Sequence, residues 1–173
     1  MNSRVLANGP LRVMFELSYE PFEVDGATIA EVKRITLDAG QNLDHYQSFY
    51  RPQASNALTA GIGIKKIDVV DKEAKAQRGT LTTWEPLRED KKGSYLGSAI
   101  IVEPNLFIRS AEDKLNLLLL ARVPPDNTAS YWAGFGWTRA GQFAFPDYSA
   151  WKTYVDQFAQ GLQSPIEVSV STQ

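Results

Sequence analysis

Residues 9–50 read GPLRVMFELSYEPFEVDGATIAEVKRITLDAGQNLDHYQSFY, and this stretch decides the fold class. From Leu11 to Tyr19 every second side chain is apolar or aromatic, and the side chains between them are mostly polar. A period of two indicates a strand with one buried face. A turn at Gly26 precedes a second strand over 28–38. A turn at 38–40 then separates this strand from a third that begins near Leu43. The stretch therefore predicts successive antiparallel strands.

The apolar residues change parity within the second predicted strand. Val32 lies on one parity, and Ile35 and Leu37 lie on the parity of Lys33. A β-bulge near Lys33 and Arg34 explains the change, because one extra residue reverses the facing of everything that follows. A strand that is buried on both faces explains it equally well.

Apolar runs bounded by turn residues predict further strands in the rest of the chain. They cover residues 58–67, 80–85, 97–102, 115–123, 131–138 and 166–170. The run 115–121 is almost continuously apolar, which favours a central strand covered on both faces over a short buried helix. We interpret the polar segments 71–73 and 88–93 as exposed hairpin loops.

One helix is predicted near residues 148–162. Trp151, Tyr154, Val155 and Phe158 form an apolar stripe with the helical period, and we expect all four to be largely buried against a sheet. Asp147 or Ser149 can cap its first turn, and the pair 164–165 ends it. With the strands, this predicts an all-β fold, either an antiparallel β-sandwich or a large curved sheet, with one C-terminal helix.

The composition is typical of one globular domain over residues 1–173, with 43 % hydrophobic and 22 % charged residues. A net charge of −2 without a basic block argues against a nucleic-acid partner. The chain has no cysteine and one histidine, which excludes disulfides and a histidine-rich zinc site. The longest apolar run is too short for membrane insertion, and no signal peptide is visible in this chain. No calcium-loop, phosphate-loop or dinucleotide pattern occurs, so no metal or cofactor is expected.

Four segments in order resemble the domain-of-unknown-function family 4861. They are NGPLRVMFELSYEPFEVDG, EVKRITLDAGQNLDHYQSFY, YWAGFGWTRAGQF and WKTYVDQFAQGLQSPIEVSV, and their spacing matches over nearly the whole chain. The resemblance implies a β-supersandwich related to the galactose-mutarotase-like fold. It also implies a periplasmic or secreted protein of bacterial polysaccharide-utilisation systems, near enzymes that process unsaturated uronic-acid sugars. It brings no established set of catalytic residues.

Family members are usually much longer than this chain, so the resemblance implies that the chain is their C-terminal part. A half-sandwich leaves an apolar sheet face or a strand edge uncovered. We therefore expect such a surface around the apolar parity of residues 11–19, or a homo-oligomer or missing N-terminal part that covers it.

Aromatic residues are the first candidates for an oligosaccharide site, because their rings can pack under the apolar face of a sugar. With one nearby arginine the candidate set is Trp84, Tyr131, Trp132, Trp137 and Arg139. Alternation separates Trp132 from Tyr131 and Trp137, and it places Trp132 beside Gly134 and Gly136, which leave room for a ligand or another backbone. The alternative is that one aromatic face is simply core.

Lys33 and Arg34 are the candidate cations for the carboxylate of a uronate, which arginine can hold through two hydrogen bonds. We expect one of them to share a groove with Trp84, Trp132 or Trp137. The alternative is a solvated strand face.

His45 is the only side chain that titrates near neutrality without a perturbation. A β-elimination on a uronate needs a base for the C5 proton and a cation that stabilises the enolate-like charge. His45 or a tyrosine is the candidate base, with Lys33 or Arg34 as the stabilising group. The alternative is an ordinary structural histidine.

The sequence thus predicts a carbohydrate-active protein that acts on or binds uronate-containing oligosaccharides, with lyase or dehydratase chemistry as the reaction type. Two alternatives stay open, a non-catalytic carbohydrate-binding module and a truncated structural domain without activity of its own, so the sequence does not decide whether the chain is an enzyme. A cleft with cations and a titratable group would favour an enzyme, and a flat aromatic platform would favour a binding module. A large exposed apolar face would favour the truncated domain.

Overall fold

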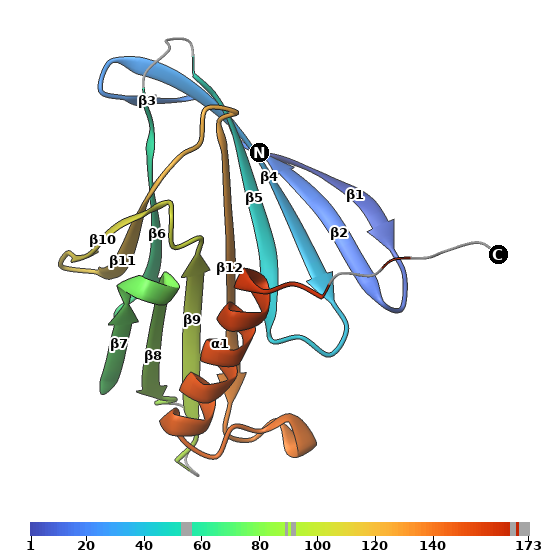
Figure 1. Cartoon of the computed structure of the whole chain (residues 1–173), viewed down its shortest axis with the longest axis vertical. Helices are drawn as coiled ribbons and strands as arrows, with labels where there is room; N and C mark the ends of the chain where they lie inside the picture. Colours follow the sequence, from blue (N-terminus) through green and yellow to red (C-terminus); the bar gives the residue numbers. More distant parts are fainter. Residues whose placement is uncertain (53–56, 89, 91–92, 167–168, 170–173) are drawn as a thin grey trace.

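The computed structural model describes residues 1–52, 57–88, 90, 93–166 and 169, which form two β-sheets and one long helix (Figure 1). The strands are β1 (Asn2–Asn8), β2 (Arg12–Ser18), β3 (Phe22–Val24), β4 (Ala27–Asp38), β5 (Leu43–Pro52), β6 (Thr59–Lys65), β7 (Asp71–Lys75), β8 (Thr80–Pro86), β9 (Tyr95–Val102), β10 (Phe107–Glu112), β11 (Asn116–Arg122) and β12 (Thr128–Trp137). The helix is α1 (Tyr148–Gln163), and short 3₁₀ turns lie at η1 (Ala76–Arg78) and η2 (Gly141–Phe143).

The larger sheet has nine strands in the order β1-β2-β4-β5-β12-β9-β8-β7, with β3 paired to β4. The smaller sheet has the order β10-β11-β6. Every strand pair is antiparallel. The predicted class, mostly β with successive antiparallel strands and one C-terminal helix, is confirmed.

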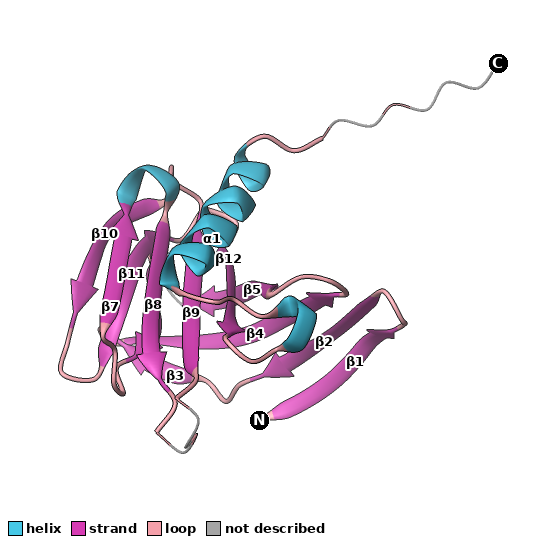
Figure 2. Ribbon diagram, turned by 90° about the horizontal axis from the view of Figure 1, so that it is seen from below, coloured by secondary structure: helices cyan, strands magenta, loops and turns pink. Residues whose placement is uncertain are grey.

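The central part of the large sheet is covered on both faces (Figure 2). Ala99 and Ile101 of β9 pack against α1, and we call their side of the sheet the helix face. Ile100 and Val102 pack against the small sheet, and we call that side the groove face. The alternation of β9 therefore supplies both layers of the core from one strand.

Two glycines let α1 lie close to the helix face. A Cβ atom on Gly97 would lie 2.5 Å from the Trp151 ring, and one on Gly136 would lie 2.5 Å from the Phe145 ring. Trp151 is 0 % exposed, and its Nε1 donates a hydrogen bond to the carbonyl oxygen of Ser98 at 3.2 Å. Within the YWAGFGW segment, Gly136 thus makes room for Phe145 and Trp151, and Gly134 makes room for the backbone of Asn42.

The predicted helix is confirmed, with bounds 148–163. Asp147 is its N-cap, since its carboxylate accepts a hydrogen bond from a backbone N–H of the first turn at 2.8 Å. Trp151 and Val155 are fully buried as expected. Tyr154 and Phe158 are only half-buried, because they pack at the margin of the core cluster under the helix.

The predicted β-bulge near Lys33 and Arg34 is wrong. The registers of β2 with β4 and of β4 with β5 run through both residues without a shift. The other interpretation agrees with the structure, because both faces of β4 are half-buried or better along the strand.

Two further expectations are wrong. Residues 71–73 belong to β7, an edge strand whose exposed charges make it look like a loop. β11 is central in the small sheet as predicted, but only one face is fully covered, since Leu117 and Leu119 are buried and Leu118 and Leu120 are half-buried. The predicted strand over 166–170 lies mostly outside the described residues.

β1 is an edge strand and all of its residues are exposed. The apolar parity of β2 is partly covered, since Val13, Phe15 and Leu17 are half-buried.

No described helix is long and apolar enough to span a membrane.

Glu16 joins the three strands at this end of the large sheet. Its carboxylate accepts hydrogen bonds at 2.7 Å from Arg34 of β4 and at 2.7 Å from Arg4 of β1, and its side chain is 11 % exposed. The Arg34 guanidinium, and Arg4 after it, hold the pKa of Glu16 below its ordinary value.

We expect Glu16 to make the folded state sensitive to acid. A carboxyl group with a lowered folded-state pKa adds stability above its unfolded pKa, and this stability is lost as the pH falls through the folded pKa. Glu16→Gln should therefore lower the melting temperature near neutral pH and flatten its decline between about pH 5 and pH 3. Glu20→Gln, at an exposed position, is the control. A decline as steep in Glu16→Gln as in the wild type would contradict this role.

Candidate functional site

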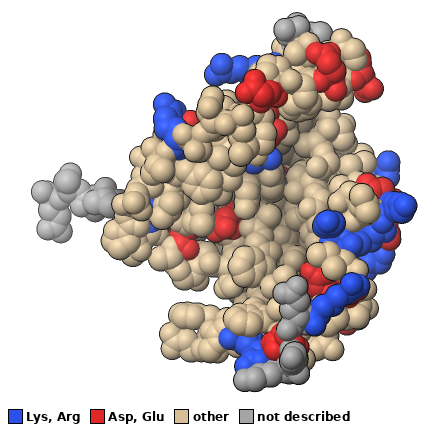
Figure 3. All heavy atoms as spheres, turned by 180° about the vertical axis from the view of Figure 1, so that it is seen from behind, with Lys and Arg blue, Asp and Glu red and all other residues tan. Residues whose placement is uncertain are grey.

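A groove opens on the groove face, where the free edge of β6 lies over the large sheet. Strands β4, β5, β12 and β9 form its floor, and its volume is about 360 Å³. From behind, the molecule is hollowed along its middle between mostly uncharged residues, and many Lys and Arg side chains lie along one side together with Asp and Glu (Figure 3). We call the space the tyrosine groove, after its polar lining residues Lys33, Tyr46, Ser48, Tyr50 and Tyr131.

The strand registers bring these side chains together. Lys33 of β4 is paired with Ser48 of β5, and Tyr46 of β5 is paired with Tyr131 of β12. Directly paired residues point to the same face of a sheet. The Tyr46 and Tyr131 rings stack, with centroids 5.1 Å apart and planes 5° from parallel. The groove therefore has an aromatic surface beside an ammonium group.

Lys33 is held between a carboxylate and a ring. Its Nζ lies 3.4 Å from Oε1 of Glu31 and 5.4 Å from the centroid of Tyr19. Glu31 Oε1 and Ser48 Oγ are both buried, and neither has a hydrogen-bond partner within the described chain. A buried polar atom without a hydrogen-bond partner destabilises the folded state, and such an atom usually bonds a water or a ligand. Ser48 lines the cavity, and the Glu31 carboxylate reaches it through its ion pair with Lys33, so the groove fits a polar ligand.

The phenols of the groove are hydrogen-bond donors at neutral pH. Burial raises the pKa of Tyr46, Tyr50 and Tyr131 above the ordinary value, and the Glu31 charge adds to the rise for the last two. The Ser48 hydroxyl lies near the Tyr50 and Tyr131 phenols without reaching hydrogen-bond geometry. The groove thus offers aromatic surface, O–H donors and one ammonium group, which is paired with the Glu31 carboxylate.

Of the sequence-predicted site residues, Lys33 and Tyr131 line this groove. The expected groove that joins Lys33 to a tryptophan is not found in the described chain, because the registers place Trp84 and Trp132 on the helix face. Arg34 also lies on the helix face, where its guanidinium bonds Glu16 and lines a different cavity of about 740 Å³. The alternation that separates Tyr131 from Trp132 is confirmed.

The other predicted aromatic residues lie elsewhere. Trp84 is 5 % exposed and belongs to the core under α1, so the core interpretation holds for it. Trp137 is exposed at the far end of β12, and Arg139 beyond it pairs with Asp90 at 3.2 Å. The structure does not bring these three residues to Lys33.

His45 lies on the helix face, so the sheet separates it from Lys33. Its ring stacks on Trp132 with centroids 4.6 Å apart, and its Nε2 lies 2.7 Å from Ser130 Oγ. Burial lowers the pKa of His45, which favours the neutral imidazole at pH 7. His45 and Lys33 therefore do not form one acid–base site.

Sequence reasoning missed Tyr46, Ser48 and Tyr50, and it considered Glu31 only as a member of a carboxylate pair. The signal was present in the alternation of residues 44–50, which puts Tyr46, Ser48 and Tyr50 on one face of a strand. Only the pairing with β4 and β12 adds Lys33 and completes the groove. Across the part of the chain that the structure describes, no three His, Cys, Asp or Glu side chains converge for a metal ion.

Comparison with known proteins finds a family model that matches nearly the whole chain. Residues 1–168 match the model of a family described as "Domain of unknown function (DUF4861)". "Uncharacterized protein P7" of Formosa agariphila is 27 % identical over 175 residues, which cover 96 % of this chain and 42 % of that relative. The chain therefore spans less than half the length of the relative. No solved structure matches it.

Proposed function

This chain belongs to the family DUF4861, and we propose that it is a carbohydrate-active protein that binds uronate-containing oligosaccharides in the tyrosine groove. The observation that carries the proposal is the position of Lys33. Its ammonium group lies beside stacked tyrosine rings and the buried Ser48 hydroxyl in one cavity of about 360 Å³, and it pairs with the Glu31 carboxylate at 3.4 Å. Cavities of this size lie in the range of small-ligand sites.

Each part of a uronate residue has a counterpart in the groove. The carboxylate fits the Lys33 ammonium, since a charge-assisted hydrogen bond is stronger than a neutral one. Sugar hydroxyls can donate to Glu31 Oε1 and bond the Ser48 hydroxyl, which removes the cost of leaving these atoms unpaired. The apolar face of the sugar ring can lie on the Tyr46–Tyr131 pair.

A cleft that combines a cation with a carboxylate supports an enzyme over a passive binding module. In a β-elimination, Glu31 would take the C5 proton of the uronate, the bond between C4 and its oxygen would break, and a phenol would protonate the leaving oxygen. The product carries a C4=C5 double bond conjugated with the carboxylate. Lys33 would stabilise the negative charge that develops on the carboxylate during proton removal.

The test uses two neighbouring cations on opposite faces of β4. Lys33→Met should weaken binding of a uronate trisaccharide by about 10–100-fold, the effect of one charge-assisted hydrogen bond of about 1.5–3 kcal/mol. Arg34→Met is the matched control and should leave the affinity within about twofold, because Arg34 points to the helix face. Calorimetric titration measures both.

A neutral oligosaccharide of equal length is the control ligand. Equal affinity for the neutral and the uronate ligand, or equal losses in the two variants, would contradict the proposal. Absorbance of the conjugated double bond, followed with wild type and Glu31→Gln, separates turnover from binding alone. A rise that depends on Glu31 indicates elimination, and binding without a rise indicates a binding module.

A further inference from the structure

We propose a second carbohydrate site on the helix face, which takes one neutral sugar residue against the indole ring of Trp132. A cavity of about 270 Å³ lies between the C-terminal end of α1, strand β12 and the segment that follows β9. Its lining residues are Arg78, Ile101, Glu103, Asn105, Trp132 and Leu162, among others. It is separate from the tyrosine groove, because Trp132 and Tyr131 point to opposite faces of β12.

The Trp132 ring is held by its neighbours and lines the cavity. His45 stacks on one ring face, with planes 14° from parallel, and His45 is itself held by Ser130. Ile101 is the partner of Trp132 on the other neighbouring strand, and the cavity opens on that side. The ring is half-buried, unlike the fully packed Trp151. A held aromatic ring beside a cavity loses little entropy when a ligand stacks on it.

The cavity combines an apolar wall with a polar rim. Leu162 and Ala159 of α1 and Ile101 of β9 form the wall, and the small Ala159 side chain leaves space there. Glu103 and Asn105 lie at the rim. A pyranose has the same two parts, because its C–H face can stack on an aromatic ring while its hydroxyl edge makes hydrogen bonds. A volume of about 270 Å³ suits a single sugar residue.

The charges at the rim favour a neutral sugar over a uronate. Arg78 is turned to Asp156, with Nη1 at 3.1 Å from its carbonyl oxygen and at 3.7 Å from its carboxylate. Glu103 and Asn105 have no ion pair or side-chain hydrogen bond within the described chain. A carboxylate ligand would therefore meet an unpaired Glu103, and Arg78 is turned to Asp156, whose carboxylate also bonds Lys75 at 2.7 Å.

The experiment titrates the protein with methyl glucoside, methyl galactoside, methyl mannoside and methyl glucuronide, followed by amide chemical shifts in NMR. We expect saturable binding of at least one neutral glycoside and weaker binding of the glucuronide. Trp132→Ala should weaken the neutral binding by about tenfold, and Trp132→Phe, which keeps a smaller ring, should weaken it less. Trp137→Ala is the matched control, because Trp137 is exposed on the opposite parity of β12.

The outcomes separate this site from the tyrosine groove. Lys33→Met should leave the neutral binding unchanged, since Lys33 lies on the other face of the sheet. If Trp132→Ala fails to fold, the affinity of Trp132→Phe for the neutral glycosides decides the result. Absence of saturable neutral binding, equal weakening by Trp137→Ala, or stronger binding of the glucuronide than of every neutral glycoside would overturn the proposal.

Discussion

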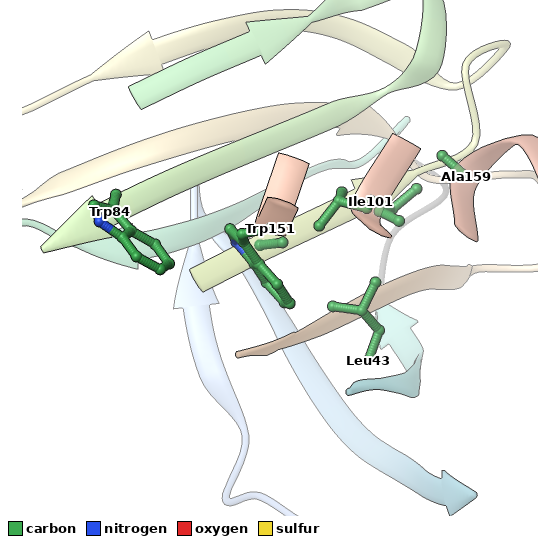
Figure 4. Close-up of a cluster of buried hydrophobic side chains, with 7 residues drawn as sticks. Leu43, Trp84, Ile101, Trp151 and Ala159 are labelled. Atoms are coloured by element: carbon green, nitrogen blue, oxygen red, sulfur yellow. The ribbon is translucent and has the colours of Figure 1, made fainter. Parts of the chain in front are cut away.

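Trp151→Ala is expected to lower the free energy of unfolding by about 3–5 kcal/mol, as for other large buried aromatic residues. Trp151 is 0 % exposed and lies in the core cluster between α1 and the large sheet (Figure 4). The substitution leaves a cavity among rings, since Phe145 and Tyr154 lie with centroids at 4.9 Å and 5.6 Å. It also removes the donor to the carbonyl oxygen of Ser98.

Urea denaturation followed by circular dichroism measures this loss, and the melting temperature should fall by roughly 6–20 °C. Trp137→Ala provides the control, because its ring is partly in solvent and should change stability by about 1 kcal/mol or less. A loss below about 1 kcal/mol for Trp151→Ala would show that α1 does not hold the sheet in this way.

Gly97→Ala is expected to destabilise the fold by about 1–3 kcal/mol, although alanine suits a strand better than glycine. The new Cβ would lie 2.5–2.7 Å from three atoms of the Trp151 indole, which is too close for any real contact. Trp151 cannot move aside, because it is fully buried. The added methyl group therefore pushes α1 away from the sheet.

A double-mutant cycle tests the cause. In the Trp151→Ala background, Gly97→Ala should cost almost nothing, so the coupling energy should be about 1–3 kcal/mol. Gly161→Ala is the matched control, since nothing lies within 4 Å of its new Cβ and the residue is in an exposed helix turn. There the same chemical change should stabilise the fold by up to about 1 kcal/mol. Equal costs of Gly97→Ala in both backgrounds would contradict the packing argument.

The two proposed sugar sites share one strand. Tyr131 belongs to the tyrosine groove and Trp132 to the cavity beside α1, although they are adjacent in β12. A strand in the middle of a sheet that is covered on both faces can serve both faces, because its side chains alternate. Substitutions at these two neighbours should therefore affect different ligands.

Much of the local structure was predictable from the sequence. The alternation over 11–19 predicted β2, the stripe at Trp151 and Val155 predicted α1, and Asp147 was one of the two residues named as its cap. Charged edge strands were not predictable in this way, because β7 has no buried face to give its sequence a period. The supposed bulge at Lys33 was wrong for a related reason, since a strand with two half-buried faces imitates a change of parity.

The sequence by itself determined which residues of each strand share a face, because a period of two is built into the extended backbone. It therefore separated Tyr131 from Trp132 before any strand was placed. Only the tertiary structure decided that β5 lies between β4 and β12. This order puts Tyr46 and Tyr131 beside Lys33 on one face, and it stacks Trp132 on His45 on the other face. These pairings join segments far apart in the chain, and they depend on how the whole sheet buries its apolar faces, which no local pattern records.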